Sequence, residues 1–538
     1  MKKLISLILT AAMLITCAAL TSCGGDNSAG DPVDTLEVHP STDKYRNYYE
    51  IFVTSFCDSD DDGFGDLQGI ISKLDYLNDG DPTTDTDLGI DGIWLTPIMP
   101  SASYHKYDVD DYFNIDSAFG TLDDFDQLVK QCHKRGIKLI IDMVLNHCSS
   151  YHPLFKSACK QALEGNLDGD ARYFEIAHYD ENPGDAYTSI GKGYYYESNF
   201  SPRMPEWNLN EKCTRDYFSK ISKFWLKDHD VDGFRLDATL YYTNSRTDGK
   251  EFLKWFYSDA KKIKSDVYMV GEEWSGNADI IDMYESGADS FFSFNFAGPS
   301  GGFMEAARNG SAPALVSQLK RYEEYTKQSN SDAINCYFLS NHDQIRSANY
   351  ISGVGASGVK MAAALYMLLP GNSFIYYGEE LGLSQDGSQN ADEYKREPMI
   401  WDSEKLPEIN VGGVTKADES QCKYGGAKQQ SEDSSSILSF YRRLIKIKNQ
   451  NPEIARGTID ENESGDDSVM SCKLTSGDTT LLVYHNLSQE EERTVELSGD
   501  AELRGTLIAS DNAENNSVSL DGKSLKLPAY STAVLKLK

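Results

Sequence analysis

The chain has 538 residues, of which 40% are apolar, and it carries 84 acidic against 51 basic side chains, for a formal net charge of −33. This length and apolar content exclude a disordered chain and predict one large core plus a further domain, because single cores stop growing near roughly 250–300 residues. The acidic residues are spread along the chain, which argues against nucleic acid as a partner because phosphate binding requires a basic surface.

The first residues have the pattern of an export signal. Two lysines precede an uncharged, mostly apolar run over residues 4–20, which is shorter than the roughly 20 residues that a membrane span needs. The residues ending at Cys23 resemble the lipobox of bacterial lipoproteins, which implies removal of residues 1–22 and diacylation of the Cys23 thiol. An ordinary signal peptide or an anchor helix is the alternative. Residues 23–44 are then a lipid anchor and flexible polar linker, and the protein is expected outside the cytoplasm on a bacterial membrane or cell surface.

From residue 45 to residue 456, short apolar strands alternate with amphipathic helices. Strands are predicted at 49–55, 92–96, 139–145, 233–237, 267–271, 335–339 and 373–377, and helices at 122–135 and 214–228. Continuous apolar runs of this length are typical of parallel strands buried on both faces. Repeated alternation over about 400 residues favours an α/β fold of the (β/α)8 TIM-barrel type over an open sheet.

Two segments depart from this alternation. Residues 148–210 are polar and aromatic with little clear helix, which indicates a small domain inserted after the third strand. Residues 457–538 contain short alternating strands, at 479–483, 494–497 and 531–537, and predict a C-terminal antiparallel β-sandwich. The cysteines show no CxxC pair and no zinc-ligand spacing.

Polar residues end several of the predicted barrel strands, where a buried strand would not ordinarily keep them. They are Asp142, Asn146 and His147, then Arg235 and Asp237, then Glu272, then His342 and Asp343. The carboxyl ends of barrel strands converge on one face, so residues far apart in sequence meet there. Three of these carboxylates, Asp237, Glu272 and Asp343, lie on separate strands and, together with an arginine and two histidines, predict a catalytic site.

These segments resemble the four signature regions of the α-amylase family of glycoside hydrolases, in the family's order, at residues 142–147, 233–238, 270–272 and 338–343. Residues 204–208 and 371–380 resemble two lesser motifs of the family. The resemblance implies retaining hydrolysis, with Asp237 as nucleophile, Glu272 as general acid/base and Asp343 as the third acid, which binds sugar hydroxyls. Retention requires two carboxyl groups about 5–5.5 Å apart, and Glu272 must be protonated at rest, so we expect a raised pKa.

The resemblance also implies the substrate contacts. Arg235 keeps Asp237 ionised, Tyr107 stacks under the sugar, and His105, His147 and His342 bind its hydroxyls, with Asp108 beside them. The histidines are expected to be neutral, because a neutral imidazole both donates and accepts hydrogen bonds. Where many α-amylases carry Lys and His on the leaving-group side, this chain has Leu240 and Tyr241, so we expect Tyr241 or Tyr242 to serve there.

An Asp-rich loop follows the first strand and resembles the calcium loop of many bacterial α-glucan hydrolases. The expected ligands are side chains of Asp58, Asp60, Asp62 and Asp66 and the Phe64 carbonyl, which together suit a hard cation. The alternatives are an acidic solvated turn and an EF-hand, and the latter is disfavoured because Gly69 occupies the twelfth position. We therefore expect Ca²⁺ as a structural ion, in a loop off the substrate path, and no organic cofactor.

The function predicted from the sequence is endo-acting hydrolysis of α-1,4 bonds in starch and maltooligosaccharides by a monomer. Exo-acting relatives commonly carry an Asp three residues before the stacking tyrosine, where with an arginine it closes the pocket; here that position is Tyr104, and the would-be partner is Arg396. The alternatives are an exo-acting α-glucosidase or a neopullulanase or transglycosylase of the same family. A non-catalytic glucan-binding protein is a distant alternative, because such a protein should have lost one of the three acids.

Overall fold

The computed structural model describes residues 35–538 except 352, 414 and 511–516. The predicted export signal, the Cys23 lipidation site and most of the predicted linker lie outside the described residues. Within the described part of the chain, no helix is both long enough and apolar enough to cross a bilayer.

Eight parallel strands form the central barrel, as predicted. In the order of the sheet they are β10 (Cys336–Tyr337), β11 (Asn372–Tyr376), β1 (Asn47–Ile51), β2 (Gly92–Leu95), β3 (Lys138–Met143), β7 (Gly233–Leu236), β8 (Tyr268–Gly271) and β9 (Ser290–Phe291). A parallel bridge between Phe292 and Cys336 joins the two outer strands. Amide-to-carbonyl hydrogen bonds from Ser293 to Cys336 and from Ile334 to Asp289 lie on either side of this bridge and close the barrel.

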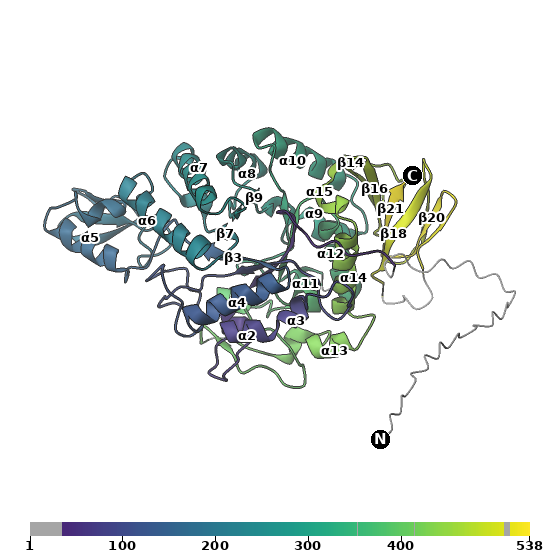
Figure 1. Cartoon of the computed structure of the whole chain (residues 1–538), viewed down its shortest axis with the longest axis horizontal. Coiled ribbons are helices and arrows are strands. Elements are labelled where there is room, and N and C mark those ends of the chain that lie inside the picture. The colour runs from purple at the N-terminus through teal and green to yellow at the C-terminus, as the bar shows by residue number, and fades with distance from the viewer. Residues whose placement is uncertain (1–34, 352, 414, 511–516) are drawn as a thin grey trace, which may run out of the picture.

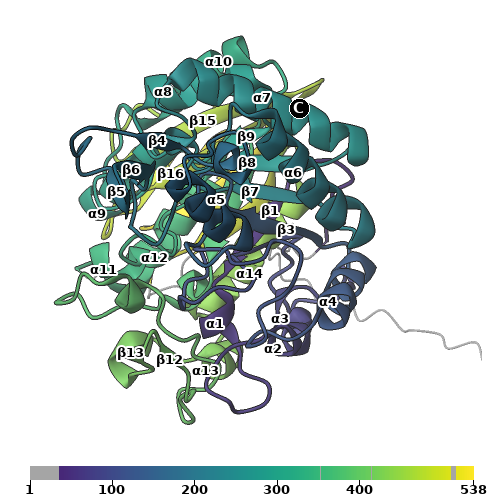
Figure 2. The same cartoon turned by 90° about the vertical axis from the view of Figure 1, so that its left-hand side faces the viewer.

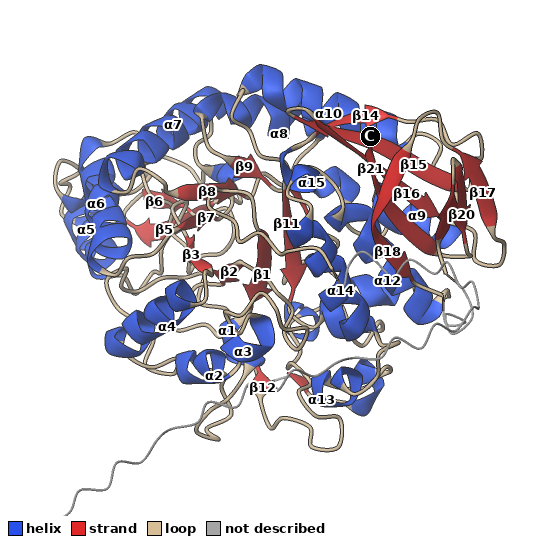
Figure 3. Ribbon diagram, turned by 45° about the vertical axis from the view of Figure 1, so that its right-hand side comes forward, coloured by secondary structure: helices blue, strands red, loops and turns tan. Residues whose placement is uncertain are grey.

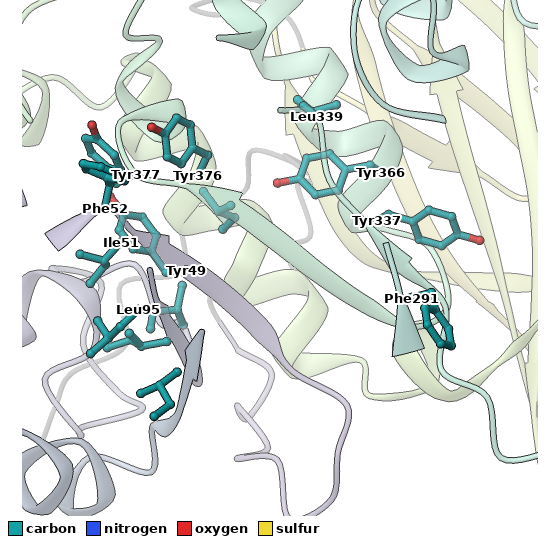
Figure 4. Packing of buried hydrophobic residues seen from close by; sticks show 14 of the residues in the cluster. Tyr49, Ile51, Phe52, Leu95, Phe291, Tyr337, Leu339, Tyr366, Tyr376 and Tyr377 are labelled. Carbon is teal, nitrogen blue, oxygen red and sulfur yellow. The ribbon is translucent and has the colours of Figure 1, made fainter. Parts of the chain in front are cut away.

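The pleat of the strands separates two apolar layers. Tyr48, Trp94 and Ile140 belong to a cluster that fills the barrel interior, whereas their neighbours such as Tyr49 and Ile93 pack in the larger core outside the strands. Figure 4 shows part of that larger core, where rings of Tyr49, Phe52 and Tyr377 lie around the strands. Both faces of each strand are buried, which explains the continuous apolar runs in the sequence.

Helices surround the barrel (Figure 1). They are α1 (Val53–Phe56), α2 (Leu67–Ser72), α3 (Leu74–Leu77), α4 (Leu122–Lys134), α6 (Lys212–Lys223), α7 (Arg246–Ile263), α8 (Asn277–Met283), α9 (Gly302–Asn309), α10 (Leu315–Ser329), α11 (Ser347–Tyr350), α12 (Gly355–Met367), α13 (Ala427–Ser431), α14 (Ile437–Gln450) and α15 (Glu453–Arg456). Helix α4 begins at a capping box between Thr121 and Asp124, which satisfies amide groups that the first turn leaves free. The predicted helix at 214–228 is α6 followed by a π-helical turn over Phe224–Asp228.

The sequence missed the shortest elements. Strand β9 has only two residues, too few for any periodicity to be read. The segment predicted as strand 49–55 ends earlier, because β1 stops at Ile51 and α1 begins at Val53. The insertion also holds more regular structure than expected: α5 (Pro153–Leu163) and a three-stranded antiparallel sheet of β4 (Ile176–His178), β6 (Tyr194–Glu197) and β5 (Tyr187–Gly191).

The C-terminal domain is the predicted antiparallel β-sandwich. One sheet has the order β14 (Thr458–Glu461), β15 (Val469–Ser476), β16 (Thr479–Asn486), β21 (Ser531–Leu537) and β18 (Ala501–Ile508), and the other β17 (Arg493–Glu496), β20 (Ser524–Leu527) and β19 (Ser519–Asp521). In β16, Leu482 and Tyr484 face the sandwich interior, whereas Leu481 and Val483 join the core shared with the barrel. The sandwich lies at the opposite end of the molecule from α5 (Figures 1 and 3).

Candidate active site

Arg235 organises the carboxylates at the carboxyl ends of β3, β7 and β8. Its Nη1 lies 2.8 Å from an oxygen of Asp142 and 2.8 Å from Oδ1 of Asp237, and its Nη2 lies 2.9 Å from Oε2 of Glu272. Because Nη1 and Nη2 belong to one guanidinium group, Asp237 and Glu272 are held as neighbours. Arg235 is fully buried, so its charge acts with little screening by solvent.

Glu272 has the raised pKa that was expected from the sequence. Burial, opposed by Arg235 and reinforced by the charges of Asp237 and Asp343, raises the pKa of Glu272 to about 8. Its Oε2 also accepts a hydrogen bond from the amide of Ala238 at 3.0 Å. Oε2 is therefore occupied, and Oε1 is the oxygen left to carry a proton toward a substrate.

The backbone that delivers this amide is strained. Ala238 follows Asp237 directly and has a φ of 50°, a left-handed conformation that non-glycine residues adopt at a cost. The turn points the Ala238 amide at Glu272 and leaves Asp237 at the end of β7. One residue thus links the two carboxyl groups through the main chain.

Asp343 is held between two cations. Its Oδ1 lies 2.6 Å from Nη2 of Arg396, and its Oδ2 lies 3.1 Å from Nε2 of His342. Burial would raise the pKa of Asp343, but the charges of His342 and Arg396 outweigh it and hold that pKa well below its usual range. Asp343 is therefore ionised at neutral pH.

His342 differs from the neutral ring expected from the sequence. Its Nδ1 lies 2.6 Å from Oε1 of Glu50, a buried carboxylate on β1. Burial lowers the pKa of His342, but the charges of Asp343 and Glu50 overcome this effect and raise the pKa to about 10. Glu50 was not identified in the sequence, because a lone Glu in an apolar strand carries no signal of a partner elsewhere in the chain.

Tyr107 lies against His342, with ring centroids 5.5 Å apart and planes at 8°. The Tyr107 hydroxyl donates to Oδ2 of Asp142 at 2.9 Å, so the ring is fixed in place at the base of the site. Lys106, just before it, has a φ of 65° and an ammonium group 2.7 Å from Asp116. This kink separates Tyr107 from His105.

His105 and Asp108 occupy the same loop but differ in their surroundings. Nδ1 of His105 accepts the Tyr107 amide at 3.1 Å, and burial, reinforced by Arg396, lowers the pKa of His105 to about 4, so this ring is neutral. Asp108 is buried, and its Oδ1 accepts from the hydroxyls of Ser101 and Ser103. Asp108 therefore braces the loop through Oδ1, and its predicted role as a substrate contact stays a prediction.

His147 is positioned by the inserted domain. Its backbone forms an antiparallel bridge to Glu206, and the amide of Trp207 donates to the carbonyl of Asn146 at 3.0 Å. The short motif at 204–208 thus returns the chain from the insertion to the barrel. His147 is buried and, among the described residues, its Nε2 has no hydrogen-bond partner; burial lowers its pKa, which leaves a neutral ring able to bind a hydroxyl.

Exposed aromatic rings, those of Tyr241 and Trp274, lie close to Glu272, and only Tyr241 was predicted from the sequence. Tyr241 is 43% exposed and packs edge-on against Phe200 of the insertion at 4.8 Å, whereas Tyr242 is buried. Of the two tyrosines considered for the leaving-group side, only Tyr241 is therefore accessible. Trp274, two residues after Glu272, is 47% exposed and stacks on Phe294; its position after the acid was the signal that could have identified it.

The Asp-rich loop brings together three of its predicted ligands. Carboxylate oxygens of Asp58, Asp60 and Asp66 all lie within 4.8 Å of one another. Asp62 is not part of this group, and its Oδ1 accepts the Phe64 amide at 2.9 Å. None of the three forms an ion pair with a basic side chain in the described part of the chain. Converging unpaired carboxylates fit a hard cation.

Two family models match the chain. The model described as "Alpha amylase, catalytic domain" matches residues 50–457, and the model described as "Alpha-amylase SusG C-terminal domain" matches residues 469–534. The chain belongs to the alpha-amylase family of glycoside hydrolases. The resemblance inferred from the signature segments is confirmed.

Relatives of this family enzyme cover nearly its whole length. Alpha-amylase 3 of Dictyoglomus thermophilum is 34% identical, and the match covers 92% of this chain and 94% of the relative. An oligo-1,6-glucosidase of Bacillus cereus is 27% identical, and the match covers 91% of this chain and 98% of the relative. The solved structure of Eubacterium rectale Amy13B superposes with a TM-score of 0.86 and 37% identity, covering 94% of this chain and 98% of the other. The chain is thus an enzyme acting on α-glucans, although the relatives' names differ in bond specificity.

Proposed function

We propose that this family member is an endo-acting, retaining α-amylase that cleaves α-1,4 bonds within starch and maltooligosaccharides. The observation that carries the endo specificity is Tyr104, whose hydroxyl receives a hydrogen bond from Nη1 of Arg396 at 2.7 Å. A neutral ring thus stands where an exo-acting enzyme would place a carboxylate paired with arginine. Tyr104 cannot supply the carboxylate that would grip the hydroxyls of a terminal sugar, which supports an open cleft.

The geometry supports a two-step mechanism. Oδ2 of Asp237 is free of the Arg235 contact and attacks the anomeric carbon, while Oε1 of Glu272 gives its proton to the departing glycosidic oxygen. In the second step the Glu272 carboxylate removes a proton from water, which attacks the same carbon and releases Asp237. His147 and Asp343 bind sugar hydroxyls during both steps.

An activated substrate separates the two carboxyl roles. Fluoride leaves without protonation, so Glu272→Gln should still form a glycosyl-enzyme from α-maltosyl fluoride, whereas Asp237→Asn should not. Both variants should lose at least about a thousandfold in turnover of amylose, because each removes an interaction made in the transition state. More than a tenth of wild-type turnover in either variant would disprove the role assignment.

The mode of attack is tested by product analysis. Endo cleavage makes the iodine colour and viscosity of amylose fall much faster than reducing ends appear. Glucose as the sole early product would instead support the exo-acting α-glucosidase alternative, and panose from pullulan would support the neopullulanase alternative. Absence of any reducing sugar from soluble starch would leave only glucan binding.

The Asp58, Asp60 and Asp66 cluster is proposed to hold Ca²⁺, which would neutralise the mutual repulsion of three converging carboxylates. The proposed role is structural. We further propose that the enzyme is exported and anchored through lipid on Cys23. Incorporation of radiolabelled palmitate into the wild type and its loss in Cys23→Ser would support the anchor; labelling that persists in the variant would refute it.

A further inference from the structure

A cavity of about 520 Å³ is lined in part by Tyr104, whose hydroxyl is linked through Arg396 to Asp343 of the active site. Its walls include Phe64 of the Asp-rich loop, Phe119, Thr54 of α1, and Gly412 in the hairpin between β12 (Asn410–Val411) and β13 (Thr415–Lys416). This volume is within the roughly 300–1,000 Å³ of typical small-molecule sites, which combine aromatic walls with a few polar groups. We call it the Phe64 pocket.

Phe64 presents its ring to solvent from a braced loop. The side chain is 41% exposed, although the loop itself packs tightly. The Gly65 amide donates to the Thr54 carbonyl at 2.7 Å, and a Cβ on Gly65 would lie 2.2 Å from the carbonyl oxygen of Val53. The loop backbone is therefore pressed against α1, so that the orientation of the exposed ring is set by the fold.

The second wall of the pocket is formed by the hairpin residues Asn410 and Gly412. The Asn410 amide donates to the Gly63 carbonyl at 3.4 Å, which ties the hairpin to the Asp-rich loop. A Cβ on Gly412 would lie 3.2 Å from the Tyr104 ring, so the hairpin also touches the ring at the edge of the active site. Figure 2 shows β12 and β13 close to α1, below the barrel strands.

The position of Glu272 indicates on which side of the cleaved bond the Phe64 pocket lies. Glu272 protonates the departing oxygen, so the reducing-side sugars lie toward Glu272 and Tyr241. Tyr104 is linked through Arg396 to Asp343 and belongs to the other side of the site. A glucan chain that passes Tyr104 toward its non-reducing end therefore enters the Phe64 pocket.

We infer that the Phe64 pocket binds an α-1,4-linked glucosyl unit on the non-reducing side of the cleaved bond, with the Phe64 ring as its stacking platform. This inference rests on the proposed endo-acting function and adds a residue that selects substrate length. It differs from the expectation that the Asp-rich loop lies off the substrate path, and the experiment with Phe64 variants decides between the two. Phe64 touches neither the catalytic carboxylates nor Tyr107, so its contribution is to affinity for longer chains.

The test compares Phe64→Ala with the conservative Phe64→Trp and with Tyr325→Ala, which removes an equally exposed ring from α10 (47% exposed). We expect kcat/KM for maltohexaose to fall about tenfold in Phe64→Ala, which corresponds to about 1.4 kcal/mol. Phe64→Trp and Tyr325→Ala should keep the wild-type kcat/KM for maltohexaose. Hydrolysis of α-glucosyl fluoride, whose single sugar places no glucosyl unit beyond Tyr104, should change by less than twofold.

A binding measurement gives a second readout. In a Glu272→Gln background, Phe64→Ala should raise the Kd for maltohexaose about tenfold in calorimetry. In Phe64→Ala with Glu272 intact, the products of maltohexaose should show cuts nearer the non-reducing end. An unchanged Kd and an unchanged pattern would overturn the inference while leaving endo cleavage intact. If the wild type itself released only glucose from amylose, the proposed function would fail independently of Phe64.

Discussion

The pH dependence of turnover is the sharpest consequence of the site geometry. Glu272 must carry a proton to assist the departing oxygen, so activity is present below its pKa and is lost as the pH rises through it. With a pKa of about 8, the protonated fraction is about 0.9 at pH 7, half at pH 8 and about 0.1 at pH 9. We therefore expect kcat/KM for maltohexaose to fall along an alkaline limb centred near pH 8.

The matched control is the neighbouring carboxyl group. Glu273 is also buried and burial raises its pKa, but its oxygens accept from Thr239 and Arg246 and not from the catalytic arginine. Glu273→Gln should keep the alkaline limb, whereas the residual activity of Glu272→Gln should be flat across it. Circular dichroism at pH 9.5 must first establish that the fold is intact. A limb centred below pH 6.5, or constant activity up to pH 10, would refute the assignment of Glu272 as the acid.

Three further predictions concern stability and charge. Thorough chelation should lower the melting temperature of the wild type, because a cation bound only by the folded loop 58–66 stabilises by about 2.7 kcal/mol at a hundredfold excess over its Kd; an unchanged melting temperature would reduce the loop to an acidic turn. Gly233→Ala should lower the free energy of unfolding by about 1–3 kcal/mol, because its Cβ would lie 1.9 Å from the Tyr268 carbonyl oxygen. The control is Gly276→Ala, whose Cβ would meet no atom within 4 Å and which should be nearly neutral. Urea denaturation measures both variants. Glu50→Gln should lower the pKa of His342, measured by NMR titration of labelled histidine, because the imidazolium loses one of its two carboxylate partners; an unmoved pKa would show that Asp343 alone keeps it charged.

The sequence by itself was sufficient for the architecture and for the polar residues that meet at the carboxyl ends of the barrel strands. Strands buried on both faces of a barrel need continuous apolar runs, and the polar residues that end them, such as Asp237 and Glu272, are conspicuous against that background. The sandwich could also be predicted, because alternate residues of its strands face different surroundings and the sequence therefore has a period of two. The apolar runs and the period of two are both properties of short segments, so they can be recognised without knowledge of the fold.

Tertiary structure decided whatever depends on a contact between distant segments. Strand β9 has two residues and owes its place to the closing of the barrel. The charge of His342 depends on Glu50, which is 292 positions away in the chain, and the pocket at Phe64 exists only because a loop, a hairpin and Tyr104 meet. Local periodicity reports which side of an element is buried, but the partner that shifts a pKa or completes a pocket is chosen by packing in three dimensions.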